Sequence, residues 1–141
     1  MGRTYRNINT QGFYLIMQIN LINMTFPQLV LIENNSCEEI IAENTLDNLS
    51  NPQEYLIEAI KKLRGNGIIR LSGNDIVEIS KNIITGTMTI DAANQVLYAT
   101  GRKSINNMFK LIAILEQAGL KIIDKRLFGV QYFIRGQKTN D

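Results

Sequence analysis

The sequence predicts an α+β fold, in which strands and amphipathic helices alternate within one chain of domain size. Its 141 residues are 45% hydrophobic and 20% charged, which fits a globular domain that can bury a core. Short β-rich runs alternate with helical patterns in the second half, and a hairpin pattern closes the chain. No segment approaches 18 uninterrupted apolar residues, which argues against a membrane span.

The first 50 residues are expected to form an N-terminal extension to which the pattern assigns no role. Strand-like runs occur at residues 14–22 and 28–32, and a short turn of helix is expected at residues 37–43. Polar residues then cluster at 44–52 around few apolar ones. We therefore predict a boundary there, with an extension at 1–50 and a binding domain at 51–141.

A helix is predicted at residues 52–64. Ser50 or Asn51 can cap its amino end, and Pro52 suits the first helical position. The Gly-Asn-Gly run at 65–67 ends it. Apolar residues recur at helical spacing and would form the buried face: Leu56, Ile60 and Leu63.

A β-α-β pattern follows. The β-rich run at 68–71 predicts a strand, and Asn74 or Asp75 can cap a helix with Ile76, Ile79 and Ile83 on one face. Residues 96–100, Val-Leu-Tyr-Ala-Thr, predict a second strand that is largely buried.

The strongest helical pattern covers residues 103–118, after a turn at Gly101. Its apolar arc is wide: Ile105, Met108, Phe109, Ile112 and Leu115 share one face, with further apolar residues beside them. Such an arc indicates burial on more than one side, against a sheet and a neighbouring helix or against a second subunit.

The chain is expected to close with a hairpin. The β runs at 120–127 and 130–135 are separated by Phe128-Gly129, a plausible tight turn. Val130, Tyr132 and Ile134 would lie on its inner face.

Taken together, residues 67–136 predict the order β-α-β-α-β-β in a two-layer domain. This order resembles the Alba family of nucleic-acid-binding proteins, as do the 22 residues at 74–95 between the first two strands and the run Gly101-Arg102-Lys103-Ser104-Ile105. The resemblance implies a non-catalytic protein that binds RNA or DNA through its backbone. It also implies a homo- or heterodimer.

The charge distribution is compatible with that resemblance. Residues 28–100 hold five Lys/Arg against ten Asp/Glu, while residues 101–141 hold eight against three. This asymmetry favours contact with a polyanion, or an intramolecular or dimeric match between the two halves. By the resemblance, Arg102 and Lys103 would face phosphates at a helix start, and the hairpin would extend the surface with Lys125, Arg126, Phe133 and Arg135. Ordinary solvated surface is the competing interpretation of these charges.

Two other interpretations stay open at this point. Residues 89–135 also fit a helix, a turn, a recognition helix and a β wing, as in winged-helix DNA-binding regulators. A domain that serves protein interaction or assembly, and binds no nucleic acid, is the second.

The side-chain chemistry gives little support to an enzyme. The chain has no His and one Cys, so the usual general base, the commonest metal ligand and an internal disulfide are excluded. No phosphate-binding loop or nucleophile elbow occurs. We therefore expect no catalytic residue, no metal and no cofactor, and an intracellular setting in the cytoplasm or nucleus.

Overall fold

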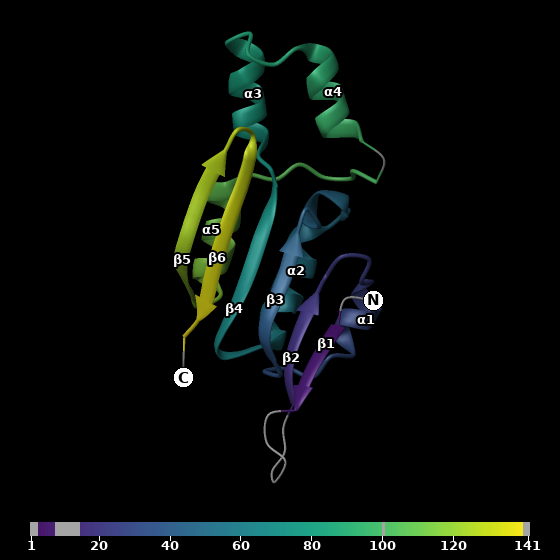
Figure 1. The fold of residues 1–141 in the computed structure, drawn as a ribbon, viewed down its shortest axis with the longest axis vertical. Coiled ribbons are helices and arrows are strands. Elements are labelled where there is room, and N and C mark those ends of the chain that lie inside the picture. Colours follow the sequence, from purple (N-terminus) through teal and green to yellow (C-terminus); the bar gives the residue numbers. More distant parts are fainter. Residues whose placement is uncertain (1–2, 8–14, 100, 140–141) are drawn as a thin grey trace.

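One six-stranded mixed sheet organises the chain, in the order β1-β2-β3-β4-β6-β5 (Figure 1). The computed structural model describes residues 3–7, 15–99 and 101–139. The strands are β1 (Arg3–Asn7), β2 (Leu15–Asn20), β3 (Cys37–Glu43), β4 (Leu63–Asn74), β5 (Leu120–Phe128) and β6 (Gln131–Lys138). The helices are α1 (Phe26–Val30), α2 (Pro52–Lys62), α3 (Ile76–Ile84), α4 (Ile90–Tyr98) and α5 (Met108–Gln117), with the 3-10 turn η1 at Leu46–Asn48.

Three neighbouring strands run in the same direction and end at one edge of the sheet. β2, β3 and β4 are parallel neighbours, while β1 and β6 run antiparallel to the strands beside them. The parallel strands therefore end together, at the upper edge in Figure 1, where η1 and the α3–α4 pair lie. We call this edge the carboxyl edge.

The helices α1, α2 and α5 cover one face of the sheet, the far face in Figure 1. Their buried side chains join one core with strand residues that include Ile19, Ile40, Ile69 and Ile134. The near face carries no helix in the described part of the chain, and we call it the open face. Among the described residues, no helix is long and apolar enough to cross a membrane.

Five of the predicted elements are confirmed. The strand runs predicted at 14–22 and 68–71 contain β2 and lie within β4, respectively. α2 begins at Pro52, with the Asn51 side chain accepting a hydrogen bond from the Glu54 backbone N–H. α3 begins after Asp75, which is its N-cap. The closing hairpin is present as β5 and β6, and both Tyr132 and Ile134 are buried.

Three segments have a different secondary structure from the one predicted. Residues 28–32 were expected to be a strand but lie in and after α1, because Thr25 and Gln28 form a reciprocal capping box. Residues 37–43 form the strand β3 instead of a helix, since Cys37, Ile40 and Ala42 alternate into the core. Residues 96–98 end helix α4, which Thr89 caps through the Ala92 N–H. Thr100 lies outside the described residues.

The last predicted helix starts later than expected. α5 begins at Met108 with Asn107 as its N-cap, because residues 102–105 form no regular element and Asn106 is held in a single bridge with Asp75. The order from β4 onward is therefore β-α-α-α-β-β, and the predicted β-α-β-α-β-β arrangement of the Alba type is wrong.

Residues 1–50, to which the pattern assigned no role, supply a large part of the sheet. β2 and β3 pair with each other, and β3 pairs with β4 over six positions. Residues 44–52, where a boundary was expected, hold η1 and the start of α2. The domain division itself stays a prediction.

Candidate functional site

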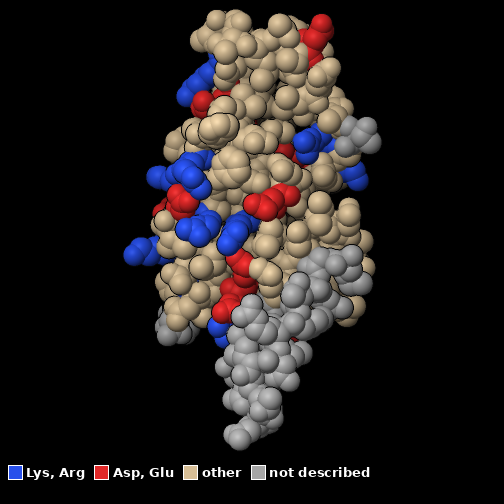
Figure 2. All heavy atoms as spheres, viewed as in Figure 1, with Lys and Arg blue, Asp and Glu red and all other residues tan. Residues whose placement is uncertain are grey.

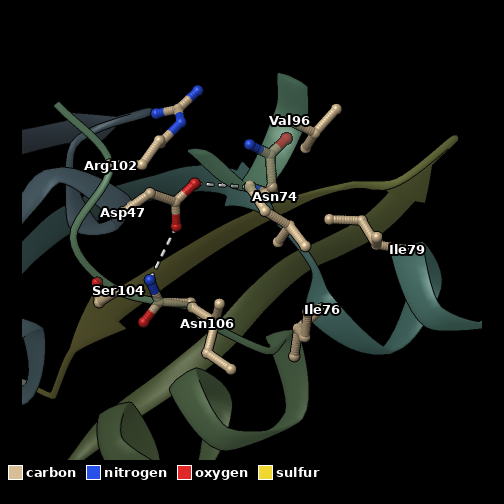
Figure 3. A pocket seen from close by; sticks show the side chains of 10 residues that line it. Asp47, Asn74, Ile76, Ile79, Val96, Arg102, Ser104 and Asn106 are labelled. Carbon is tan, nitrogen blue, oxygen red and sulfur yellow. Dashed lines mark hydrogen bonds between the residues drawn. The ribbon is translucent and has the colours of Figure 1, made fainter. Parts of the chain in front are cut away.

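Polar side chains converge at the carboxyl edge from three separate parts of the chain (Figure 3). Asp47 comes from η1 after β3, Asn74 and Asp75 come from the end of β4, and Ser104 and Asn106 come from the segment that leads into α5. In open sheets with parallel strands, ligands bind in the crevice outside the carboxyl ends of the strands. The carboxyl edge is therefore the expected location of a ligand site.

Asp47 ties η1 to both neighbouring parts of this edge. Its carboxylate accepts hydrogen bonds from the Asn74 backbone N–H at 3.1 Å and the Asn106 side-chain amide at 2.8 Å. Its carbonyl oxygen accepts from the backbone N–H groups of Lys103 and Ser104, at 2.7 and 3.1 Å. Asp47 is buried, and its hydrogen bonds hold the segment 102–106 in place.

The Asp75 carboxylate holds the amino ends of two helices. Its Oδ1 accepts from the backbone N–H groups of Val77 and Glu78, at 2.9 and 3.2 Å, and so caps α3. Its Oδ2 accepts from the Met108 N–H at 2.8 Å, in the first turn of α5. The Asn107 side-chain amide contacts both oxygens at 3.2 Å. One buried carboxylate therefore fixes the starts of α3 and α5 relative to the end of β4.

Behind these two carboxylates lies the buried hydroxyl of Tyr132. No described residue accepts or donates a hydrogen bond at this hydroxyl. Burial, with Asp47 and Asp75 nearby, raises the Tyr132 pKa above its usual range. A Cβ atom at Gly73 would lie 2.8 Å from this hydroxyl and 3.2 Å from Asp47 Oδ2. Gly73 is therefore needed for the close approach of β4 to these two side chains.

Two spaces adjoin this cluster. The first is a cavity of about 10 Å³, room for about one water molecule. The side chains of Asp47, Asn74 and Arg102 line it together with Ile76 and Ile79 of α3 (Figure 3). The second is a surface hollow of about 300 Å³, which we call the edge hollow; its lining is Leu97, Tyr98, Arg102, Lys103, Ser104 and Ile105.

The open face carries a row of charges across four strands. On β3 and β4, Glu39 pairs with Arg70 at 2.9 Å. On β5 and β6, Asp124 contacts Arg126 at 3.4 Å and Arg135 at 3.9 Å. Figure 2 shows cationic and anionic side chains intermixed over the middle of this face. A hollow of about 290 Å³ lies among them, bounded also by Glu43 and Phe133.

The structure divides the predicted site residues into two groups. Arg102 and Lys103 lie together in the edge hollow, but on an irregular segment and not at a helix start. Arg126, Phe133 and Arg135 line the open-face hollow. Lys125 is exposed and alternates to the opposite side of β5. The two groups do not form one continuous basic surface, because Glu43 and Asp124 stand among the arginines.

The sequence did not predict that Asp47 and Asp75 together position the segments of the carboxyl edge. Asp75 was predicted as a cap of α3, but its bond to α5 depends on a contact across 33 positions in sequence. Asp47 has no local signal, since its partners are Asn74 and Asn106. Cys37 is buried, and burial raises the pKa of its thiol, so it is not a reactive cysteine.

No protein-family model matches the sequence, and no curated protein is similar enough in sequence to match. Solved structures do share the fold. An O-methyltransferase family protein from Burkholderia thailandensis has a TM-score of 0.54 at 10% identity, covering 73% of this chain and 30% of its own. A SAM-dependent methyltransferase from Thermotoga maritima, a possible histamine N-methyltransferase, has a TM-score of 0.54 at 15% identity, covering 77% and 59%.

A third neighbour catalyses a different reaction on the same fold. The cyclase SpnF has a TM-score of 0.54 at 14% identity, covering 77% of this chain and 52% of its own. This chain spans between 30% and 59% of the length of these three structures. At these identities the likeness establishes the fold, which is that of SAM-dependent methyltransferases.

These neighbours overturn the functional expectations. The Alba resemblance and the non-catalytic nucleic-acid-binding function are wrong, and so is the winged-helix alternative, because the chain shares its fold with methyltransferases. The interaction-module alternative stays a prediction. The local order of the winged-helix alternative is present in α4, α5 and the hairpin, but the hairpin is the edge of the large sheet. The expectation that the chain is not an enzyme is overturned by the same neighbours. Dimerisation stays a prediction.

The absence of His and of a second Cys was a weak reason to exclude catalysis. A methyl group on a sulfonium is already activated, so its transfer depends on the cofactor and on alignment more than on a protein nucleophile. The described residues hold no cluster of three or more His, Cys, Asp or Glu side chains placed to bind a metal.

The described residues fit S-adenosylmethionine only in part. Glu43 is exposed at the carboxyl end of β3, where an acidic side chain can accept hydrogen bonds from ribose hydroxyls. Asn23 and Asn44 follow β2 and β3 in the left-handed conformation, with φ of 60° and 54°. No glycine occurs between residues 13 and 64, however, and the end of β2 is closed by buried Leu21 and Met24. No reaction step is therefore derived through the cofactor.

Proposed function

We propose that this chain acts in methyl transfer from S-adenosylmethionine, with the reaction located at the carboxyl edge. The observation that carries the proposal is the convergence of η1, the end of β4 and the segment 102–106 at this edge, in a fold shared with methyltransferases. Asp47 and Asp75 act as positioning residues, because their carboxylates are occupied by bonds to the backbone and to asparagine amides.

Glu43 is the residue proposed to hold the cofactor's ribose. Its carboxylate is exposed at the end of β3, and the backbone of the adjoining β2 end is bound there through the Leu21 N–H and the Ile41 carbonyl oxygen, at 2.8 Å. Two parallel strands thus end side by side at a carboxylate, which is the arrangement that favours a nucleoside in sheets of this type.

We place this reaction inside the cell, in the cytoplasm or nucleus. The support is the single cysteine, Cys37, which is buried and cannot form an internal disulfide.

The test is equilibrium dialysis of the full chain against labelled S-adenosylhomocysteine, the product of methyl transfer. Saturable binding is expected, and Glu43→Gln should weaken it about tenfold, because a charged acceptor for two hydroxyls is lost. Glu116→Gln, an exposed position at the end of α5, is the matched control and should leave binding unchanged.

Two results would contradict the proposal. One is the absence of saturable binding at millimolar concentrations of the labelled product. The other is equal binding by the wild type and Glu43→Gln, which would remove the carboxyl end of β3 from the site. Transfer of label from methyl-labelled S-adenosylmethionine to a panel of small acids then tests the reaction itself.

A further inference from the structure

We propose that the edge hollow binds a small organic anion with an aromatic or alkyl body, an aryl carboxylate or aryl phosphate being the simplest form. That this anion is the methyl acceptor rests on the proposed function. The binding itself does not, since it depends only on the residues that form the hollow.

The size of the hollow suits a small molecule and not a polymer. Its volume is about 300 Å³, which lies at the lower end of the range for ligand pockets. It adjoins the small space at the ends of β3 and β4, because Arg102 and Ser104 line both. A molecule in the hollow would therefore lie next to the carboxyl edge.

The charge of the lining selects for an anion. Arg102 and Lys103 line the hollow, and its described lining residues include no carboxylate. One guanidinium nitrogen of Arg102, Nη1, donates to the Asn48 side-chain oxygen at 3.2 Å. Its Nε is buried and has no hydrogen-bond partner among the described residues. Charge-assisted hydrogen bonds to a guanidinium or an ammonium group are about twice as strong as neutral ones, so the two cations favour an anion over a neutral molecule of the same shape.

The walls explain why the anion should carry an apolar body. Tyr98 is 77% exposed and Ile105 is 64% exposed, and both border the hollow beside the two cations. Large apolar side chains left in water beside a polar group are a feature of binding sites more than of plain surface. A ring lying against Tyr98 and Ile105 would place its acid group at Arg102 and Lys103.

The segment that carries the cations is held in one place before any ligand binds. Gly101 has a φ of +90°, which turns the chain out of α4. The Lys103 and Ser104 N–H groups then bind the Asp47 carbonyl oxygen, and Ser104 Oγ donates to the Leu46 carbonyl oxygen at 2.9 Å. A site on a fixed backbone loses less entropy on binding than one on a free loop.

The test is a ¹H–¹⁵N NMR titration of the full chain with three probes of one shape: 1-naphthoate, 1-naphthyl phosphate and the neutral 1-naphthamide. The two anions should shift the amide signals of residues 97–105 saturably. Each should bind at least about tenfold more tightly than the amide, because only the anions form charge-assisted bonds.

Three variants locate the binding. Arg102→Gln should weaken naphthoate binding about tenfold, and Lys103→Gln should weaken it several-fold, with naphthamide unaffected by either change. Lys121→Gln, at an exposed lysine of β5, is the matched control. Lys103 is exposed, so its variant keeps the test valid if Arg102→Gln impairs folding.

The outcomes separate this inference from the proposed function. Naphthamide binding as tight as naphthoate, no saturable shift in residues 97–105, or equal loss in Lys121→Gln would overturn the anion site. Naphthoate binding in the hollow without any binding of S-adenosylhomocysteine would uphold the anion site and remove the proposed function. Methyl transfer to acids that is unchanged in Lys103→Gln and Arg102→Gln would overturn the acceptor assignment.

Discussion

The two faces of the sheet are formed by the same strands but carry different kinds of side chain. Toward α1, α2 and α5 the strands present Ile19, Ile40 and Ile69, all fully buried. Toward the open face the neighbouring positions are charged or half-buried, as with the Glu39–Arg70 pair and Phe133. Stability is therefore concentrated on the covered face, and the open face and carboxyl edge are left for function.

The largest predicted difference between the faces comes from removing a core side chain. Leu115 on α5 is fully buried, so Leu115→Ala should lower the free energy of unfolding by about 4 kcal/mol. Ile41→Ala, at a half-buried position on the open face, should cost about 1 kcal/mol. Urea unfolding followed by circular dichroism measures both. Equal losses would show that the open face is as tightly packed as the covered one.

The next largest loss of stability is expected at Asp75, on the carboxyl edge. Asp75→Ala removes the cap of α3 and the bond to the first turn of α5, and should lower the unfolding free energy by about 3 kcal/mol. Asp91→Ala, at an exposed residue in the first turn of α4, should cost less than about 0.5 kcal/mol. If the two variants are equally stable, Asp75 does not tie the two helices together.

A smaller effect is expected at the contact between β4 and β6. Gly73→Ala would force a Cβ atom to 2.8 Å from the Tyr132 hydroxyl and should cost about 2 kcal/mol. Tyr132→Phe alone removes a buried hydroxyl without a described partner, so its cost should be near zero. In the double variant, part of the Gly73→Ala loss should be recovered. Additive losses would place the strain elsewhere.

The smallest effect is a pH dependence on the covered side. The hydrogen bond from Lys62, 3.1 Å away, lowers the pKa of Glu58. Because the folded pKa lies below the unfolded one, this stabilisation is present above the ordinary glutamate pKa and is lost as pH falls through the folded value. Wild type should therefore exceed Glu58→Gln in stability at pH 7 and converge with it in acid. Chemical unfolding at several pH values checks this convergence, and a stability difference that persists in acid would contradict it.

The sequence predicted those elements whose formation depends on neighbouring residues, such as helix caps and turns. α2 and α3 were predictable because Asn51 and Asp75 cap amphipathic runs, and the hairpin was predictable from its alternation around Gly129. β3 was not, since Cys37–Glu43 becomes a strand only through pairing with β2 and β4 on both sides. α4 was missed because Val96 and Leu97 are β-prone residues at the end of a helix that Thr89 starts.

The sequence identified the cationic residues of the site, but not the hydrogen bonds that position them. Arg102 and Lys103 were identified from a local basic run, and they do share a hollow. The bonds that position them come from Asp47, more than 50 residues earlier in the chain. Long-range hydrogen bonds of this kind leave no periodicity or spacing in the sequence, so the same residues were assigned to a helix start that the structure lacks.

A ¹H–¹⁵N NMR titration of the full chain with S-adenosylhomocysteine tests most directly whether the cofactor binds at the carboxyl edge. Saturable shifts are expected at the carboxyl ends of β2 and β3, at residues 21–25 and 43–48, and none at their amino ends or at residues 63–67. Shifts confined to the opposite edge, or no shift at millimolar ligand, would contradict the assignment of function to the carboxyl edge.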